Sequence, residues 1–407
     1  MIDLTSSLYL GLKHDSASVP GWERLTTGMP AALATAPAAG IVARELADVI
    51  GAEAATLAPS TLHAFWDLFG TMGAREIHVD AGTYPIAWWG AERAQCSGAL
   101  VRQFRHHDPA ALRQAVAAQR RDRSLAAARG GGPVILADGF CPGCGRVAPI
   151  ESYLAIAASV GGMVVVDDTQ ALGVLGTHAS GHPYGRGGGG IARWSRLSSP
   201  RLVVVASLAK GFGVPVAVVA SGGLAVRQYL ARSETRVHCS PPSNAHLHAA
   251  IAALRINASR GDALRSNLAA LVSQFRAGLG TLGVPLTPGL FPVQSTGAGA
   301  RLDVQGVYQR LAGLGIGTVL NRPRCRRGVA LSFIFTAEHR ETDVARVVRA
   351  VEIALGARPA VRDGGTVTGS GAAKARARYS RAAHAVDRGC PPSSPWPSSV
   401  TLAWPDG

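Results

Sequence analysis

Short apolar runs alternate with segments of helical period over the first 245 residues. Residues 133–138 (PVILAD) and 163–168 (MVVVDD) have the continuous apolar character of buried strands. Residues 41–51 and 150–161 instead repeat apolar side chains at helical spacing. Because this alternation is typical of a parallel sheet wrapped by helices, the sequence predicts a large α/β domain at 38–245.

The pattern changes after residue 245. A long helical stretch at 247–283 leads into shorter strands and helices that end near residue 355. This predicts a smaller α+β domain at 246–356, which the N-terminal segment 1–37 joins. Residues 357–407 are rich in Pro, Ser, Gly, Arg and Ala, a composition that cannot bury a core, so we expect a disordered tail there.

Composition narrows the class of protein. The apolar runs are too short to span a membrane, the N-terminus lacks a signal-peptide pattern, and the six cysteines have no regular spacing. We therefore expect a cytoplasmic protein with no membrane contact. The formal charge of +15 comes mostly from scattered arginines without a nucleic-acid motif, which predicts no nucleic-acid partner and is compatible with anionic substrates or cofactor phosphates.

A lysine interrupts two valine-rich runs in VVVASLAKGFGVPVAVVAS at 203–221. Burial would lower the pKa of Lys210 and make its amine a nucleophile suited to a Schiff base with a carbonyl or with pyridoxal phosphate. The alternative is a solvated lysine at an ordinary turn, with GFG supplying the turn. Asp167 ends another apolar run, where it could pair with the pyridine nitrogen of that cofactor or simply cap the next turn.

Several motifs carry a family resemblance. VVDDTQALGVLG at 165–176, ASLAKGFG at 206–213 and HCSPPSNAHLHAA at 238–250 occur in the order and at the spacing of the α-oxoamine synthases. Segments at 7–12, 104–112 and 138–150 add further matches, so that the similarity spans roughly residues 5–355. The resemblance implies a fold-type-I pyridoxal-phosphate transferase with a mostly parallel seven-stranded sheet and a smaller C-terminal domain.

The resemblance also assigns roles to residues. Lys210 matches the Schiff-base lysine, Asp167 the partner of the pyridine nitrogen, Tyr84 the ring-stacking position and Gln170 a donor to the cofactor's ring oxygen. The positions that match phosphate-binding residues are Ser60, Thr61, Ser207 and Ser240. Because the match of Ser240 reaches the phosphate of the other subunit, the resemblance implies a homodimer with shared active sites.

Four positions depart from the family pattern, one of them Pro142 in place of a motif serine. Tyr84 and Gln170 each replace a histidine, and Ser332 replaces the arginine that grips the substrate carboxylate. A group of arginines just upstream could substitute for that arginine, although a basic turn is more often simply solvated. These arginines are Arg322, Arg324, Arg326 and Arg327.

Three functions remain open from the sequence. The first is condensation of an amine or amino acid with an acyl thioester, carried by CoA or an acyl carrier, to give an α-amino ketone. The second is transamination, which Tyr84 and Ser332 favour. The third is an inactive relative that serves as an interaction protein, against which the presence of both Lys210 and Asp167 argues. The overall resemblance favours the first.

One further motif has metal-ligand spacing. Cys141 and Cys144 form a CPGC pair, but the sequence offers no second pair of that kind, so we expect no metal site. The glycine-dense GRGGGG at 185–190 lacks the Lys that follows in a phosphate loop and matches a flexible turn of the family.

Overall fold

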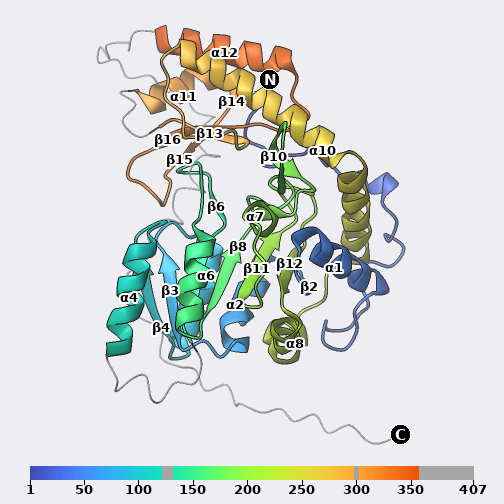
Figure 1. Cartoon of the computed structure of the whole chain (residues 1–407). Helices are drawn as coiled ribbons and strands as arrows, with labels where there is room; N and C mark the ends of the chain where they lie inside the picture. Colours follow the sequence, from blue (N-terminus) through green and yellow to red (C-terminus); the bar gives the residue numbers. More distant parts are fainter. Residues whose placement is uncertain (122–131, 298–301, 357–407) are drawn as a thin grey trace, which may run out of the picture. The chain divides into compact units, whose positions relative to one another are not determined.

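The main sheet of the protein is seven-stranded and mostly parallel, as predicted. The computed structural model describes residues 1–121, 132–297 and 302–356 (Figure 1). In order across the sheet, the strands are β2 (Ala54–Ala58), β12 (Ala217–Ser221), β11 (Leu202–Ser207), β8 (Met163–Asp167), β5 (Val134–Asp138), β3 (Glu76–Asp80) and β4 (Leu100–Phe104). Neighbouring strands are parallel except where β12 lies between β11 and β2, to both of which it is antiparallel.

Helices cover both faces of this sheet, which explains why its strands are continuously apolar. Val203 and Val205 of β11 point to one face, while Val204 and Ala206 point to the other, and all four are buried. The first face packs against α2 (Thr61–Thr71), α3 (Pro85–Cys96) and α8 (Gly223–Arg232). The second packs against α1 (Pro37–Ile50), α4 (Pro109–Arg121), α6 (Ile150–Ser159) and α7 (Gly190–Trp194).

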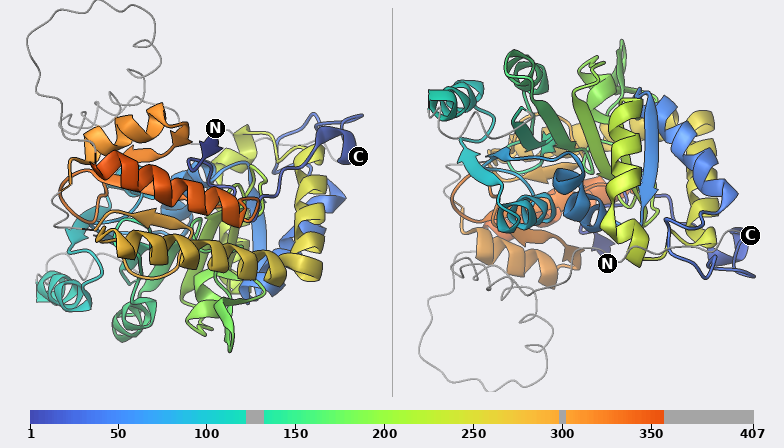
Figure 2. Two further views of the ribbon diagram at one scale, coloured as in Figure 1. Left: turned by 90° about the horizontal axis from the view of Figure 1, so that it is seen from above. Right: turned by 90° about the horizontal axis from the view of Figure 1, so that it is seen from below.

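A second, antiparallel sheet follows in the C-terminal part of the described chain. Its strand order is β13 (Val293–Ser295), β16 (Ala330–Ile334) and β15 (Val319–Asn321). The helices packed around it are α10 (Asn244–Thr281), α11 (Val304–Gly313) and α12 (Glu341–Gly356), with α12 lying along α10 (Figure 2). Phe275 of α10 packs against Phe333 and Phe335, with ring centroids 4.9 and 4.8 Å away.

The N-terminus joins this second region. Strand β1 (Ile2–Asp3) pairs in parallel with β14 (Ile316–Gly317), and the Ile334 amide donates to the carbonyl of Leu4 over 3.0 Å. The domain boundaries at 1–37, 38–245 and 246–356 stay predictions, and the predicted tail at 357–407 lies outside the described residues. The remaining short elements are η1 (Ser16–Ser18), β6 (Phe140–Cys141), β7 (Arg146–Val147), β9 (Thr177–Ala179), β10 (His182–Arg186) and α9 (Glu234–His238). None of the helices in the described ranges has both the length and the apolar character needed to cross a membrane.

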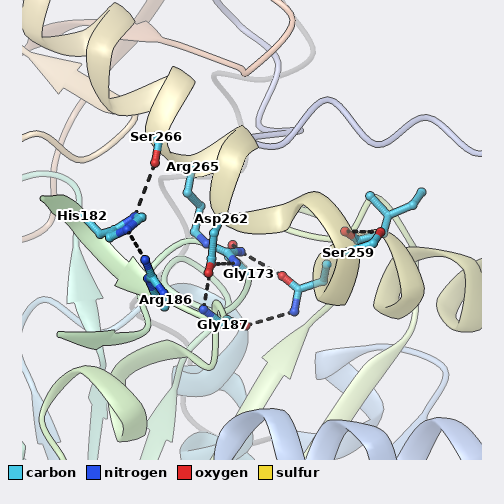
Figure 3. Close-up of polar contacts among 10 residues, drawn as sticks. Gly173, His182, Arg186, Gly187, Ser259, Asp262, Arg265 and Ser266 are labelled. Carbon is cyan, nitrogen blue, oxygen red and sulfur yellow. Dashed lines mark hydrogen bonds and ion pairs between the residues drawn. The ribbon is translucent and has the colours of Figure 1, made fainter. Parts of the chain in front are cut away.

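A buried arginine joins α10 to the loop that follows β8. The guanidinium of Arg265 donates to the carbonyl of Gly173 over 3.0 Å, to Oδ1 of Asn257 over 2.8 Å and to Oδ1 of Asp262 over 2.5 Å (Figure 3). Asp262 also accepts from the amide of Gly187 in the glycine-dense turn, over 2.9 Å. Because a buried charge is costly without partners, this network fixes the helix, the turn and the loop against one another.

Candidate active site

The carboxyl ends of the parallel strands gather the predicted functional residues at one edge of the sheet. Asp138 ends β5 and Asp167 ends β8, and the two residues are direct neighbours in the strand ladder. Ser207 ends β11, and Thr61 begins α2 just after β2. Ligands of α/β proteins bind at this edge, so its side chains are the first candidates for a site.

Lys210 lies in the connection between β11 and β12 and lines a cavity of about 410 Å³ at this edge. Its Nζ is 6.0 Å from the centroid of the Tyr84 ring. Burial lowers the pKa of the Lys210 ammonium, and the charges of Asp167 and Asp138 oppose that shift. This environment favours a nucleophilic lysine over the solvated turn lysine that the sequence left open.

Five predicted site residues line this one cavity. They are Lys210, Asp167, Tyr84, Gln170 and Thr61. Tyr84 is brought there as the residue that precedes α3, whose first position is Pro85. Gln170 accepts a hydrogen bond from the buried Tyr9 hydroxyl over 2.5 Å, so its amide nitrogen is the group presented to a ligand.

The predicted phosphate-binding serines have different surroundings. Ser60 is the N-cap of α2, where its hydroxyl accepts from the amide of His63 over 3.4 Å. Ser207 accepts from the amide of Ala209 over 3.2 Å. Ser240 lines a separate cavity of about 250 Å³, so the described chain does not bring it to Lys210. The structure thus brings the residues predicted to bind the ring, together with Thr61, to one cavity and places Ser240 at another.

A second carboxylate, which the sequence reading missed, faces the same cavity. Burial raises the pKa of the Asp138 carboxyl well above its usual range, and the charge of Asp167 raises it further. Burial also raises the pKa of Asp167, although hydrogen bonds from Thr169 oppose this shift. Asp138 accepts from the amide of Tyr84 over 3.0 Å, and Asp167 from that of Thr169 over 3.0 Å. Two carboxyl groups therefore lie near the Lys210 amine, and this part of the cavity suits a cationic ligand group.

Two of the four candidate arginines line the cavity, namely Arg322 and Arg324. Arg326 instead donates to two carbonyls, those of Gly143 over 3.1 Å and Thr296 over 2.6 Å. In this position it supports the fold and is not directed at a ligand.

Ser332, which occupies the position of the family's arginine, is buried in β16. Its hydroxyl bonds that of Ser295 over 2.7 Å and donates to Oδ1 of Asn321 over 3.2 Å. Asn321 in turn lines the cavity. At residue 332 the structure therefore has a neutral, hydrogen-bonded side chain, and the cationic groups in the cavity wall come from the loop that precedes β16.

Comparisons with known proteins agree with this geometry. Residues 42–308 match the family model "Aminotransferase class I and II". The chain is 28% identical over 261 residues to 8-amino-7-oxononanoate synthase of Dechloromonas aromatica, covering 64% of this chain and 63% of that protein. It is 27% identical over 360 residues to the protein of the same name from Klebsiella pneumoniae, covering 86% and 88%.

The fold is similar to that of a solved structure of SPT with PLP internal aldimine. The TM-score is 0.73 at 18% identity, and the alignment covers 86% of each chain. The predictions of a fold-type-I transferase fold, of a transferase enzyme class and of pyridoxal phosphate as cofactor are confirmed. This chain belongs to the aminotransferase class I and II family.

Proposed function

We propose that this protein is an acyltransferase of the α-oxoamine synthase type, which joins an amino acid to an acyl thioester and releases the thiol. The observation that carries the proposal is the single cavity in which Lys210 and Asp167 share a wall with Arg322 and Arg324. The relatives named 8-amino-7-oxononanoate synthase support it. The sequence reading favoured the same reaction.

The residues of the cavity fit pyridoxal phosphate. Burial raises the pKa of both Asp167 and Asp138, and a protonated pyridine nitrogen beside them would stabilise their charged forms. Tyr84 offers an aromatic face beside the amine of Lys210, and the N-terminus of α2 at Thr61 offers backbone N–H groups to a phosphate. Lys210 would hold the aldehyde carbon of the cofactor, and Gln170 would donate to its ring oxygen.

The chemistry of the chain centres on the Lys210 amine. Pyridoxal phosphate, when bound, supplies an electron sink for the electron pair left on the substrate α-carbon. Lys210 Nζ accepts the proton from that carbon, because burial keeps the amine closer to its neutral form than a surface lysine. Asp167, held by the amide of Thr169, would pair with the pyridine nitrogen and favour its protonated form.

The second half-reaction needs a binding site for an anionic acyl donor. In it the substrate α-carbon forms a bond to the thioester carbonyl carbon, the carbon–sulfur bond breaks, and the thiol leaves with a proton. Arg322 and Arg324 are at the cavity wall, and both are exposed enough to meet a large substrate from solvent. Guanidinium groups suit a carboxylate or the phosphates of a CoA thioester.

A homodimer forms part of the proposal. Ser240 lines a different cavity from Lys210, which is the arrangement expected if Ser240 serves the active site of a second subunit. Light scattering during gel filtration tests this assembly. A dimer in which Ser240→Ala weakens cofactor binding supports the proposal, whereas a monomer with full cofactor affinity contradicts it.

The test of the activity uses the full-length protein loaded with pyridoxal phosphate. A panel of small amino acids is mixed with acyl-CoA thioesters, and mass spectrometry follows both free CoA and the α-amino ketone. We expect CoA release that depends on the amino acid and disappears in Lys210→Ala. Exchange of the amino group with a 2-oxo acid, without CoA release, would instead identify an aminotransferase. Failure to bind the cofactor at all would leave an inactive relative.

A further inference from the structure

Three cysteines and a histidine from distant parts of the chain meet beside the active-site cavity. The Sγ atoms of Cys141, Cys144 and Cys325 and a ring nitrogen of His106 all lie within 4.8 Å of one another. Cys141 ends β6 and Cys144 lies in the turn between β6 and β7, whereas Cys325 belongs to the loop between β15 and β16 and His106 to the loop after β4. The CPGC pair therefore has the partners that the sequence did not reveal.

We infer that these four side chains form a structural zinc site of the Cys₃His type. Structural zinc is bound by four ligands at the corners of a tetrahedron, and Cys₃His is one of its common ligand sets. With Zn–S bonds of about 2.3 Å, the edge of that tetrahedron is roughly 3.8 Å. The spacing of the four atoms needs little adjustment to reach this value, and thiolate ligands select zinc over calcium or magnesium.

The histidine is already oriented for this role. Nδ1 of His106 lies 2.6 Å from Oδ1 of the buried Asp80, and Nε2 lies 3.4 Å from Sγ of Cys144. Asp80 is itself fixed, because it accepts from the amides of Gly82 over 2.7 Å and His107 over 2.8 Å. Zinc-bound histidines characteristically donate their other ring N–H to such a carboxylate, which sets the tautomer that leaves Nε2 for the metal.

The turn that carries Cys141 and Cys144 is built closely around the thiols. The amide of Gly145 donates to the carbonyl of Cys141 over 2.8 Å, and Gly145 has the left-handed φ of +69° that glycine favours. A Cβ atom at Gly143 would lie 2.8 Å from Sγ of Cys325. Glycine at 143 therefore permits the third thiol to approach the first two.

A zinc ion at this position would also influence the substrate cavity. Arg322 and Arg324, which line the cavity, precede Cys325 in the sequence. Arg326 follows Cys325 and donates a hydrogen bond to the carbonyl of Gly143. An ion that binds Cys325 to the β6–β7 turn would fix the loop that presents the two arginines. This consequence for substrate binding rests on the proposed function, whereas the metal site itself does not.

The experiment measures zinc in the full-length protein, purified under reducing conditions without chelator or histidine tag. Elemental analysis should find about one zinc per chain in the wild type, and X-ray absorption should find three sulfur neighbours near 2.3 Å and one nitrogen near 2.0 Å. Cys141→Ser, Cys325→Ser and His106→Gln should each lower the zinc content several-fold. Cys96→Ser is the matched control, because Cys96 is exposed at the end of α3 and lies outside the cluster.

Three results would overturn the inference. The first is wild-type protein without zinc both as purified and after incubation with Zn²⁺. The second is an unchanged zinc content in the cluster variants, which would indicate adventitious binding elsewhere. The third is a Cys141–Cys144 disulfide in the mass spectrum in place of bound metal. If the variants do not fold, the wild type is titrated with a thiol-specific reagent, and the zinc released is compared with the number of thiols modified. Zinc release that accompanies thiol modification supports the site, and zinc that stays bound after all thiols are modified contradicts it. The zinc content is measured whether or not the protein has synthase activity.

Discussion

Nζ of Lys210 lies 6.0 Å from the centroid of the Tyr84 ring, in the cavity that also contains the Asp167 carboxylate. An amine beside an aromatic face and a buried carboxylate is suited to hold a flat, cationic ring.

Replacing Lys210 with alanine should lower kcat by about 1000-fold or more, because the substitution removes both the nucleophile and the proton acceptor. Borohydride reduction should attach the cofactor to a wild-type peptide that contains residue 210 and to no peptide of the variant. Lys13→Ala is the control, since Lys13 is exposed and paired with Glu338 over 2.5 Å. Full activity in Lys210→Ala would refute the assignment.

The rate of cofactor uptake by the cofactor-free protein should rise with pH and level off below the ordinary lysine pKa. Burial lowers the pKa of Lys210, and the neutral amine is the reactive form. Because the charge of Asp138 holds that pKa up, Asp138→Asn should move the midpoint of the profile to lower pH. Borohydride trapping at each pH measures the rate, and a shift to higher pH would contradict the electrostatic argument.

Changing Asp167 to asparagine should reduce kcat by about 100- to 1000-fold, because it removes the charge that keeps the pyridine nitrogen protonated. The amide oxygen can still accept from the backbone of Thr169, so the fold should persist. Steady-state kinetics and circular dichroism separate the two effects. An active variant with unchanged spectra would mean that Asp167 has no part in the chemistry.

Arg322→Ala and Arg324→Ala should each raise KM for an anionic substrate by about 10-fold or more, with a smaller change in kcat, because a charge-assisted hydrogen bond is lost from binding. The matched control is Arg327→Ala, an exposed arginine of the same loop that does not line the cavity. KM values for the amino acid and the acyl thioester, measured separately, identify which substrate each arginine binds. Equal effects in all three variants would point to a general charge effect.

Arg265→Met should lower the free energy of unfolding by about 3 kcal/mol, because it leaves the partners of a buried charge without their donor. The carbonyl of Gly173 and the side chain of Asn257 lose their bonds in this variant. Urea denaturation measures the change, and Arg260→Met on the exposed side of the same helix should stay close to the wild type. A loss below about 0.5 kcal/mol would show that the network contributes little.

The sequence predicted the sheet and its lysine because these features depend on local pattern. Strands buried on both faces read as continuous apolar runs, and the predicted strands at 133–138 and 163–168 correspond to β5 and β8. The valine-rich runs around Lys210 form β11 and β12, with the lysine in the connection between them. Pattern and family motifs together therefore predicted five residues that line one cavity, and their roles there stay predictions.

The rest of the site depends on contacts between distant segments. Asp138 looks like an ordinary strand end until β5 and β8 pair and place it beside Asp167. Cys325 and His106 reach the CPGC turn through loops that no local periodicity describes. In the proposed dimer, Ser240 would contact the active site of the second subunit. The position of Ser240 relative to that site therefore cannot be read from one sequence or from one chain.

The reversed direction of β12 has a consequence for how the amine moves. Ser207 and Ala217 lie opposite each other in the ladder, and the amide of Leu208 donates to the carbonyl of Val216 over 2.8 Å, so the connection at 208–216 starts and ends on fixed backbone. The amide of Tyr9 donates to the carbonyl of Lys210 over 3.2 Å and holds it in between. Rotation of the lysine side chain alone can then withdraw the amine from an incoming substrate and return it. A one-residue insertion in this connection would displace the amine even though every side chain in the cavity remained.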